Sequence, residues 1–218
     1  MRKVFLTLLL AFLASASYSQ SGVIRDLTGA VELKPAGSSA FIPARAGSEV
    51  TQDTIISTGF KSTAIVAVGS TVITVQPLTR LSLAEISKTQ DTERLNVNLQ
   101  AGRIRVDVKP VSGTKANTVV QSPSATASVR GTSFGMDIFD TDVEEGGVDV
   151  EGNDGFNTTL YKGDKGSVDK NGSMRDAVEL ASSELNPKRP EGSGNSGEKT
   201  KPHENFSFDG FAAFGFIW

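Results

Sequence analysis

Hydrophobic and polar residues alternate with a period of two along most of the chain. In the clearest run, Ile104, Val106 and Val108 alternate with charged residues, and Leu95 and Val97 follow the same rule. This period places one set of side chains in a core and the other in solvent, and therefore predicts β-strands. Similar β-branched or alternating runs lie at residues 23–27, 30–33, 54–58, 64–68, 71–75 and 80–86.

Turn residues separate these runs at close spacing. Gly69 and Ser70 stand between two β-branched runs, which predicts a hairpin with a two-residue turn. Many short strands separated by Gly or Pro are typical of all-β domains. The pattern predicts mainly antiparallel pairing, in a sandwich or roll or in a solenoid-like twisted β structure, and it leaves these architectures open.

One segment follows a helical period instead. Ser173 can cap a helix N-terminus, and Asp176 stands three residues later in the capping-box position. An apolar stripe follows at helical spacing. We expect a short amphipathic helix over residues 173–186 that closes one end of the β structure. The stripe consists of Met174, Ala177, Val178, Leu180, Ala181 and Leu185.

The composition changes again after this segment. Residues 187–205 are rich in Pro, Gly, Ser, Lys and Glu, which predicts a flexible linker. Residues 206–218 form an aromatic tail, predicted to be disordered by itself, with Phe214, Phe216 and Trp218 as candidate binding residues. The tail could cover an apolar face of the same molecule, add as a strand to a partner's sheet, or enter a membrane interface.

The N-terminal residues resemble a secretory signal peptide. Arg2 and Lys3 precede a short apolar run, and small residues follow from Ala14 to Ser17. We therefore expect a signal peptide over residues 1–19 and a mature β domain over residues 20–172. An uncleaved anchor is the alternative. Export predicts a periplasmic location, with full secretion as the other possibility.

Composition and charge exclude several classes of function. The formal net charge is −3, which disfavours nucleic acid as a partner, and the absence of cysteine excludes thiol chemistry. The one histidine, His203, lies in the predicted linker, away from any serine-based catalytic site. Asp140 and Asp142 belong to an acidic block over residues 137–154 that lacks the spacing of a calcium loop. We expect no catalytic residues, no metal, no cofactor and no enzymatic activity.

Several ordered motifs resemble the FecR-type periplasmic domain. The most specific is residues 122–134, S-P-S-A-T-A-S-V-R-G-T-S-F, which is similar to the family's T/S-P-x-A-x-A-x-V-R-G-T-x-F signature. Together the similar segments span roughly residues 22–170. Further similar segments, in the family's order, are residues 29–31, 43–47, 53–59, 102–108 and 143–150.

The resemblance implies a role in binding. The best-described family members are membrane-anchored sigma-factor regulators whose periplasmic domain contacts an outer-membrane transporter. We expect this chain to be a freestanding exported version, so the sigma-regulator role is not carried over. The resemblance favours a non-enzymatic binding or signal-relay module with a protein partner in the cell envelope. A glycan- or peptidoglycan-associated protein is the alternative, and a hydrolase is a third. The sequence leaves the oligomeric state open, and membrane contact is expected only through the tail.

Within the signature, Arg130, Gly131 and Thr132 are the candidate site residues. A glycine between strand residues often marks a bulge or bend, which favours a structural role for Gly131. Arg130 would then form a bidentate pair with a carboxylate, with Glu145 as the candidate. The other interpretation is an exposed Arg130 that captures an acidic ligand or partner.

Overall fold

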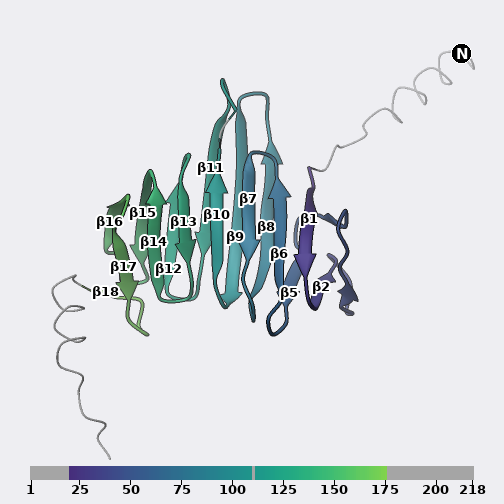
Figure 1. Ribbon diagram of the computed structural model, residues 1–218. Helices are drawn as coiled ribbons and strands as arrows, with labels where there is room; N and C mark the ends of the chain where they lie inside the picture. The colour runs from purple at the N-terminus through teal and green to yellow at the C-terminus, as the bar shows by residue number, and fades with distance from the viewer. Residues whose placement is uncertain (1–19, 110, 176–218) are drawn as a thin grey trace, which may run out of the picture.

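The described part of the chain folds into two nine-stranded sheets that enclose a common core (Figure 1). The computed structural model describes residues 20–109 and 111–175. Within these ranges it contains strands and no helix, and therefore no helix of a length and polarity that could cross a bilayer. The predicted signal peptide, linker and aromatic tail lie outside the described residues, and so does most of the predicted helix.

The strands of each sheet follow one another in a definite spatial order. The first sheet runs β18 (Met174–Arg175), β17 (Lys165–Val168), β14 (Asp140–Glu145), β13 (Ser133–Met136), β10 (Ile104–Val108), β7 (Thr71–Val75), β6 (Thr63–Val68), β1 (Gly22–Thr28) and β4 (Glu49–Val50). The second runs β16 (Asn157–Tyr161), β15 (Gly147–Gly152), β12 (Ala125–Val129), β11 (Lys115–Gln121), β9 (Thr92–Ala101), β8 (Arg80–Lys88), β5 (Ile55–Thr58), β2 (Val31–Lys34) and β3 (Ile42–Pro43).

The chain winds back and forth between the sheets as it advances along them. From β6 onward the chain places one or two consecutive strands in one sheet and then crosses to the other sheet. Strands that are close in sequence therefore also lie close together along the sandwich. In Figure 1 this progression runs from β1 and β2 on the right to β16, β17 and β18 on the left. The structure therefore combines the two predicted architectures, a two-layer sandwich built by solenoid-like winding.

Strand pairing is antiparallel with one exception among the described strands. The predicted hairpin of β6 and β7 is confirmed, with Val68 opposite Thr71 and Gly69 at a φ of 55° in its turn. The exception is β9, which pairs in parallel with β11 because the chain crosses to the first sheet as β10 between them. The two strands therefore start at the same end, with Thr92 opposite Lys115.

The core lies between the sheets and is mostly aliphatic. In β10 the predicted alternation is confirmed, since Ile104, Val106 and Val108 are buried and the residues between them are half-buried. Phe134 in β13 is the only aromatic residue among the buried core side chains of the described chain, and it is fully buried. A low aromatic content is thus sufficient, because Val, Ile and Leu fill a thin two-layer core.

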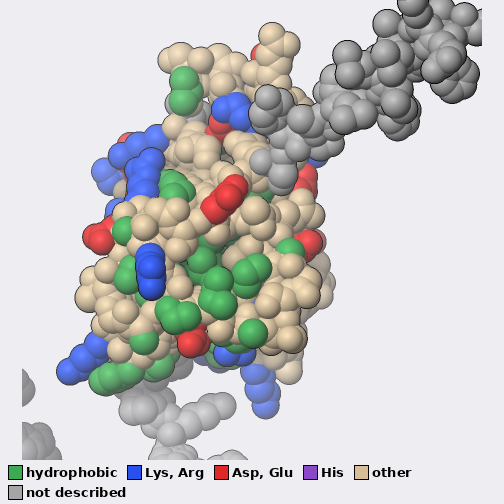
Figure 2. All heavy atoms as spheres, turned by 90° about the vertical axis from the view of Figure 1, so that its right-hand side faces the viewer, with side chains coloured by type: hydrophobic (Ala, Val, Ile, Leu, Met, Phe, Trp, Pro, Cys, Tyr) green, Lys and Arg blue, Asp and Glu red, His purple; other side chains and the backbone are tan. Residues whose placement is uncertain are grey.

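The sandwich has two open ends with short edge strands. Figure 2 looks onto the end formed by β1 to β4, where hydrophobic side chains gather at the centre of the face. Phe41 and Ile42 are exposed at this end, and β3 and β4 contain two residues each. At the opposite end β18 also contains two residues. Short edge strands limit the backbone available for pairing with other chains.

The predicted C-terminal helix does not begin where the sequence suggested. Met174 and Arg175 lie in strand β18, where they pair with Val168 and Ser167 of β17. Ser173 is not a helix cap, because its backbone N–H donates to Asp169 Oδ1 in the turn that joins the two strands. A local capping pattern was therefore overridden by pairing with β17. The remainder of the predicted helix, from residue 176, lies outside the described residues.

Candidate functional site

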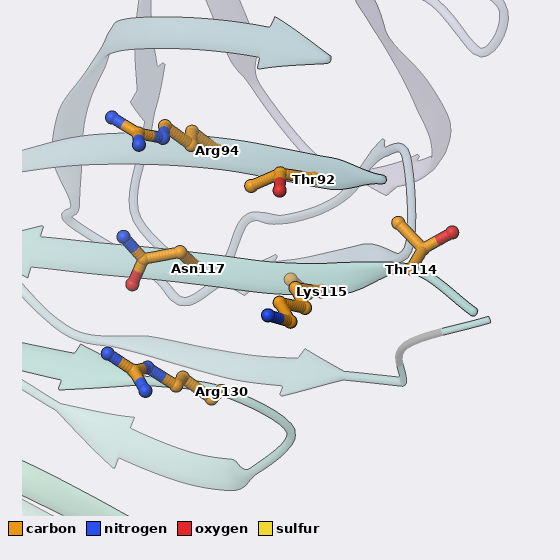
Figure 3. A pocket seen from close by; sticks show the side chains of 7 residues that line it. Thr92, Arg94, Thr114, Lys115, Asn117 and Arg130 are labelled. Carbon is orange, nitrogen blue, oxygen red and sulfur yellow. The ribbon is translucent and has the colours of Figure 1, made fainter. Parts of the chain in front are cut away.

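A row of polar side chains crosses the outer face of the second sheet. Asn117 of β11 lies opposite Arg94 of β9. On the other side β11 pairs with β12 so that Thr118 faces Val129, which places the next residue, Arg130, beside Asn117. Figure 3 shows Arg94, Asn117 and Arg130 one above another on neighbouring strands. Asn117 lies between the buried Ala116 and Thr118, and each arginine is next to one buried residue, Leu95 or Val129, so period-two alternation turns all three side chains outward.

This row borders a groove with a volume of about 540 Å³. Lys115 lies two residues before Asn117 on the same strand and faces the same way, so three cations surround the groove (Figure 3). Hydroxyl and amide groups complete the lining, in which the described residues include no carboxylate and no histidine. The lining residues are Thr92, Arg94, Thr114, Lys115, Ala116, Asn117 and Arg130.

The three cations make no ion pair with any described residue. Arg94 and Arg130 are exposed at the two ends of one cross-strand row, and like charges so placed repel each other. An anionic group in the groove would relieve that repulsion and accept several charge-assisted hydrogen bonds. The arrangement therefore suits a carboxylate-rich or otherwise anionic ligand.

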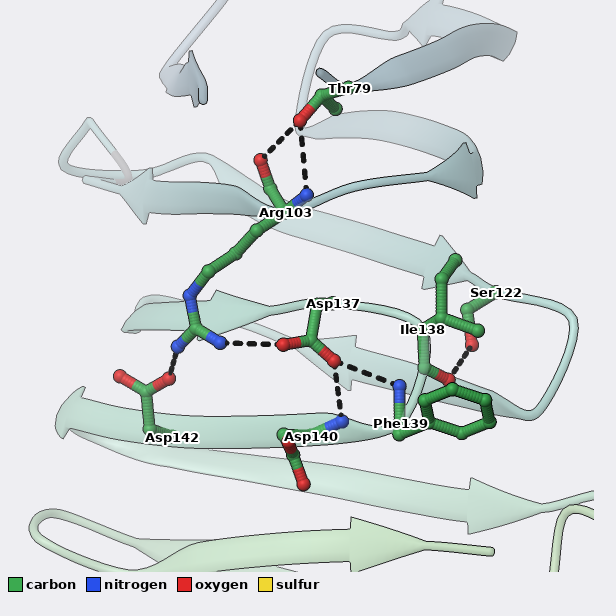
Figure 4. A network of polar contacts seen from close by, with 8 residues as sticks. All are labelled: Thr79, Arg103, Ser122, Asp137, Ile138, Phe139, Asp140 and Asp142. Atoms are coloured by element: carbon green, nitrogen blue, oxygen red, sulfur yellow. Dashed lines mark hydrogen bonds and ion pairs between the residues drawn. The ribbon is translucent and has the colours of Figure 1, made fainter. Parts of the chain in front are cut away.

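On the first sheet, next to β13 and β14, two arginines show the opposite arrangement and are matched by acids. The Arg103 guanidinium donates to Asp137 Oδ2 at 2.9 Å and also pairs with Asp142 (Figure 4). Gly135 makes room for this pair, because a Cβ there would lie 2.8 Å from Asp142 Oδ1 and 2.9 Å from Arg103 Nη2. Arg105 likewise pairs with Glu144 and with Asp107. Arg103 and Arg105 thus have acidic partners within the protein, whereas the three cations that border the groove have none among the described residues.

The same contacts account for part of the acidic block. Asp137 Oδ1 accepts the backbone N–H groups of Phe139 and Asp140 and so closes the turn between β13 and β14 (Figure 4). Asp142 pairs with Arg103, so both carboxylates already have partners inside the protein. In the part of the chain that the structure describes, no three acidic or histidine side chains gather closely enough to hold a metal ion.

The three predicted signature residues have different roles. Arg130 is exposed, lines the groove and forms no pair with Glu145, so the predicted bidentate pairing is wrong. Glu145 lies opposite Ser133 on the other sheet. Thr132 is buried, and its hydroxyl donates to the Gly147 carbonyl at 2.9 Å, which ties β13 to the start of β15. Phe214, Phe216 and Trp218 lie outside the described residues.

Gly131 allows the chain to leave the groove and cross to the other sheet. Its φ is 125°, which L side chains rarely adopt, so Gly131→Ala should lower the free energy of unfolding by about 1–3 kcal/mol. Gly37→Ala is the matched control, because Gly37 has a φ of 72° and open space around it, and should lose only about 1 kcal/mol. Urea unfolding followed by circular dichroism measures both, and equal losses would contradict a special role for Gly131.

Glu93 stabilises the strand end that carries Arg94. Its carboxylate accepts a hydrogen bond from Lys88 Nζ at 2.6 Å and from the Ser70 backbone N–H at 2.9 Å. Partial burial disfavours the charged form, but these hydrogen bonds outweigh it, so the pKa of Glu93 lies below its ordinary value. A carboxyl group whose pKa is lower in the folded protein than in the unfolded chain stabilises the fold at pH values above its unfolded pKa. That stabilisation is lost as the pH falls through the folded pKa.

The Glu93→Gln variant tests this contribution. Below about pH 4 the wild-type free energy of unfolding should fall more steeply than that of Glu93→Gln, because only the wild type loses a stabilising carboxylate. The exposed Glu49 serves as the control position, with Glu49→Gln expected to follow the wild-type profile. Parallel pH profiles for Glu93→Gln and the wild type would contradict the assignment.

Sequence reasoning identified one of the groove's three cations. Arg130 was marked by the signature, whereas Arg94 and Lys115 occur in ordinary alternating runs. Their proximity depends on the parallel pairing of β9 with β11, which joins segments separated by a strand of the other sheet. The available signal was their outward position in each run, because each of the three cations is next to a buried core residue, Leu95, Ala116 or Val129.

Fold and groove together define an all-β module whose surface is suited to an anionic ligand. Residues 54–154 match the profile of the family described as FecR protein, so the chain contains a FecR domain. The match includes the signature at residues 122–134 and every residue of the groove lining. The resemblance inferred from the motifs is confirmed.

Two solved structures to which the chain shows similarity are of a proposed anti-sigma factor of Parabacteroides distasonis ATCC 8503. One is 20% identical, with a TM-score of 0.45 over 58% of this chain and 62% of that one. A second is 19% identical, with a TM-score of 0.45 over 61% of this chain and 64% of that one. This chain therefore covers less than two thirds of either. A comparison with curated proteins gave no match.

Proposed function

We propose that the chain is a non-enzymatic FecR-type module that is exported to the periplasm and relays a signal by binding a protein partner in the cell envelope. The observation that carries the proposal is the groove of the second sheet. Three cations without intramolecular partners among the described residues surround one depression, on a protein whose net charge is negative. The partner would present an acidic segment to them.

A protein segment fits this groove better than a reaction does. General acid–base catalysis needs a titratable group poised near the working pH, and the lining offers arginine, lysine, hydroxyl and amide groups instead. Arginine forks and amides are instead well suited to recognising carboxylates. The predicted tail residues Phe214, Phe216 and Trp218 would supply a second, apolar contact to the same partner.

Site-specific photo-crosslinking in intact cells tests the proposal. A photoreactive amino acid replaces Asn117 at the centre of the cationic row, and the tagged chain is recovered after illumination. The matched control is Thr74, which is also half-buried and outward-facing on a central strand but belongs to the first sheet. We expect a protein adduct from position 117 that is absent from position 74.

The same experiment separates the alternatives. A protein adduct at position 117 that disappears when Arg94 and Arg130 are replaced by glutamine would support an acidic protein partner. Identical adducts from both positions would contradict a specific groove. Binding of the purified chain to isolated cell wall, lost with the same substitutions and without any protein adduct, would instead assign the groove to an anionic glycan.

A further inference from the structure

The C-terminal end of the sandwich contains an apolar groove between the two sheets. It has a volume of about 450 Å³ and is bordered by β16 on one side and by β17 and β18 on the other. Leu160 of β16 lies over Gly166 of β17, where a Cβ would come within 2.8 Å of the leucine. Phe156 stands at the rim with 58% of its surface exposed. The remaining lining residues are Asp154, Thr158, Lys165, Met174 and Arg175.

This end of the fold lacks a covering layer among the described residues. β16 and β18 are the last strands of their sheets, so no further described strand shields the apolar side chains between them. Met174 packs against the core yet remains partly exposed in the groove. Structures that wind along one axis require a terminal unit with a polar outer face to close the core. The groove therefore calls for an apolar occupant.

The chain itself supplies one at the right place. The described part ends at Arg175, which lines the groove, and 43 residues follow it. Residues 176–185 carry apolar side chains at helical spacing, in Ala177, Val178, Leu180, Ala181 and Leu185. A segment attached directly to the groove has a high effective concentration there.

Charge supports the same occupant. Residues 176–185 contain three acidic residues and no lysine or arginine, whereas the groove lining has two cations, Lys165 and Arg175, and one acid, Asp154. We propose that residues 176–185 dock in this groove through their apolar stripe and cap the sandwich. The domain then extends beyond its last described strand, and the predicted linker starts from a fixed point at this end. The inference is independent of the ligand of the cationic groove.

Disulfide crosslinking tests the docking, and the absence of native cysteine makes it specific. The full chain receives Thr158→Cys in the groove together with Leu180→Cys in the apolar stripe. Mild oxidation should form an intramolecular disulfide, detected by its mobility on a non-reducing gel and by peptide mass. Two control pairs each replace one of these cysteines. In the first, Glu179→Cys, on the polar side of the stripe, takes the place of Leu180→Cys. In the second, Ile42→Cys, at the opposite end of the sandwich, takes the place of Thr158→Cys.

We expect Thr158→Cys with Leu180→Cys to crosslink at least about tenfold faster than either control pair, because docking holds the two thiols together. Equal rates for the pair that uses Glu179→Cys would overturn the proposal, since an undocked segment presents both positions alike. A disulfide-linked dimer as the main product would assign the groove to a second copy. Faster crosslinking of Thr158→Cys with Phe214→Cys would assign it to the aromatic tail. Either result overturns docking of residues 176–185.

Discussion

Replacing Phe134 with alanine should lower the free energy of unfolding by about 3–5 kcal/mol, the usual loss for a fully buried aromatic side chain. Phe134 is fully buried in β13, between β10 and β14 near the centre of the first sheet. Its neighbours in the core are almost all aliphatic side chains on regular strands. A two-layer sandwich cannot collapse easily around the resulting cavity, because both sheets are held at a fixed separation.

Urea unfolding followed by far-ultraviolet circular dichroism measures this effect. The matched control is Phe60→Ala, because Phe60 lies in a turn with 73% of its surface exposed and should lose less than about 0.5 kcal/mol. If Phe134→Ala lowered the free energy of unfolding no more than Phe60→Ala does, the placement of the core between the two sheets would be wrong. An unfolded Phe134→Ala chain would agree with the prediction, and Phe134→Leu would then provide a smaller, measurable loss.

The strands could be predicted from the sequence because alternation is a local property. The residues of β10 alternate without interruption, and their burial follows the expected order. The β8 run shows the limit of this rule, since Leu81, Leu83 and Ile86 are all buried although the last breaks the period of two. A register shift between Leu83 and Glu85 restores the inward direction of Ile86. Bulges of this kind depend on the partner strand and are not visible in one strand's sequence.

The pairing of strands that are not adjacent in the chain could not be predicted from the sequence. Nothing in the runs of β9 and β11 shows that they pair in parallel, because the intervening β10 belongs to the other sheet. For the same reason the cationic groove could be predicted only through Arg130. Glu145 was the expected partner as a carboxylate from the following strand, but the chain turns at Gly131 and carries β13 and β14 into the first sheet, away from Arg130.

The largest effect on binding should come from neutralising the whole groove. With Arg94, Lys115 and Arg130 all replaced by glutamine, we expect the affinity for a fluorescein-labelled polyglutamate peptide to fall about a hundredfold. Each exposed charge pair contributes up to about 1 kcal/mol, and three together give about 3 kcal/mol. Fluorescence anisotropy measures the affinity. The measurement is made at low ionic strength, because at 0.1 M salt the interaction between exposed charges is largely screened beyond about 10 Å.

A second triple variant controls for the change in net charge. Arg25, Lys162 and Lys170 are exposed cations outside the groove lining, and their replacement by glutamine removes the same total charge. This variant should retain most of the affinity and the salt dependence of the wild type, whereas the groove variant should lose both.

Equal losses in the two variants would show that the peptide responds to overall charge, and the groove would then have no selective role. Wild-type affinity in the groove variant would exclude the three cations from binding altogether. The comparison therefore separates a placed set of cations from a general electrostatic field, which acts on any anion near the protein.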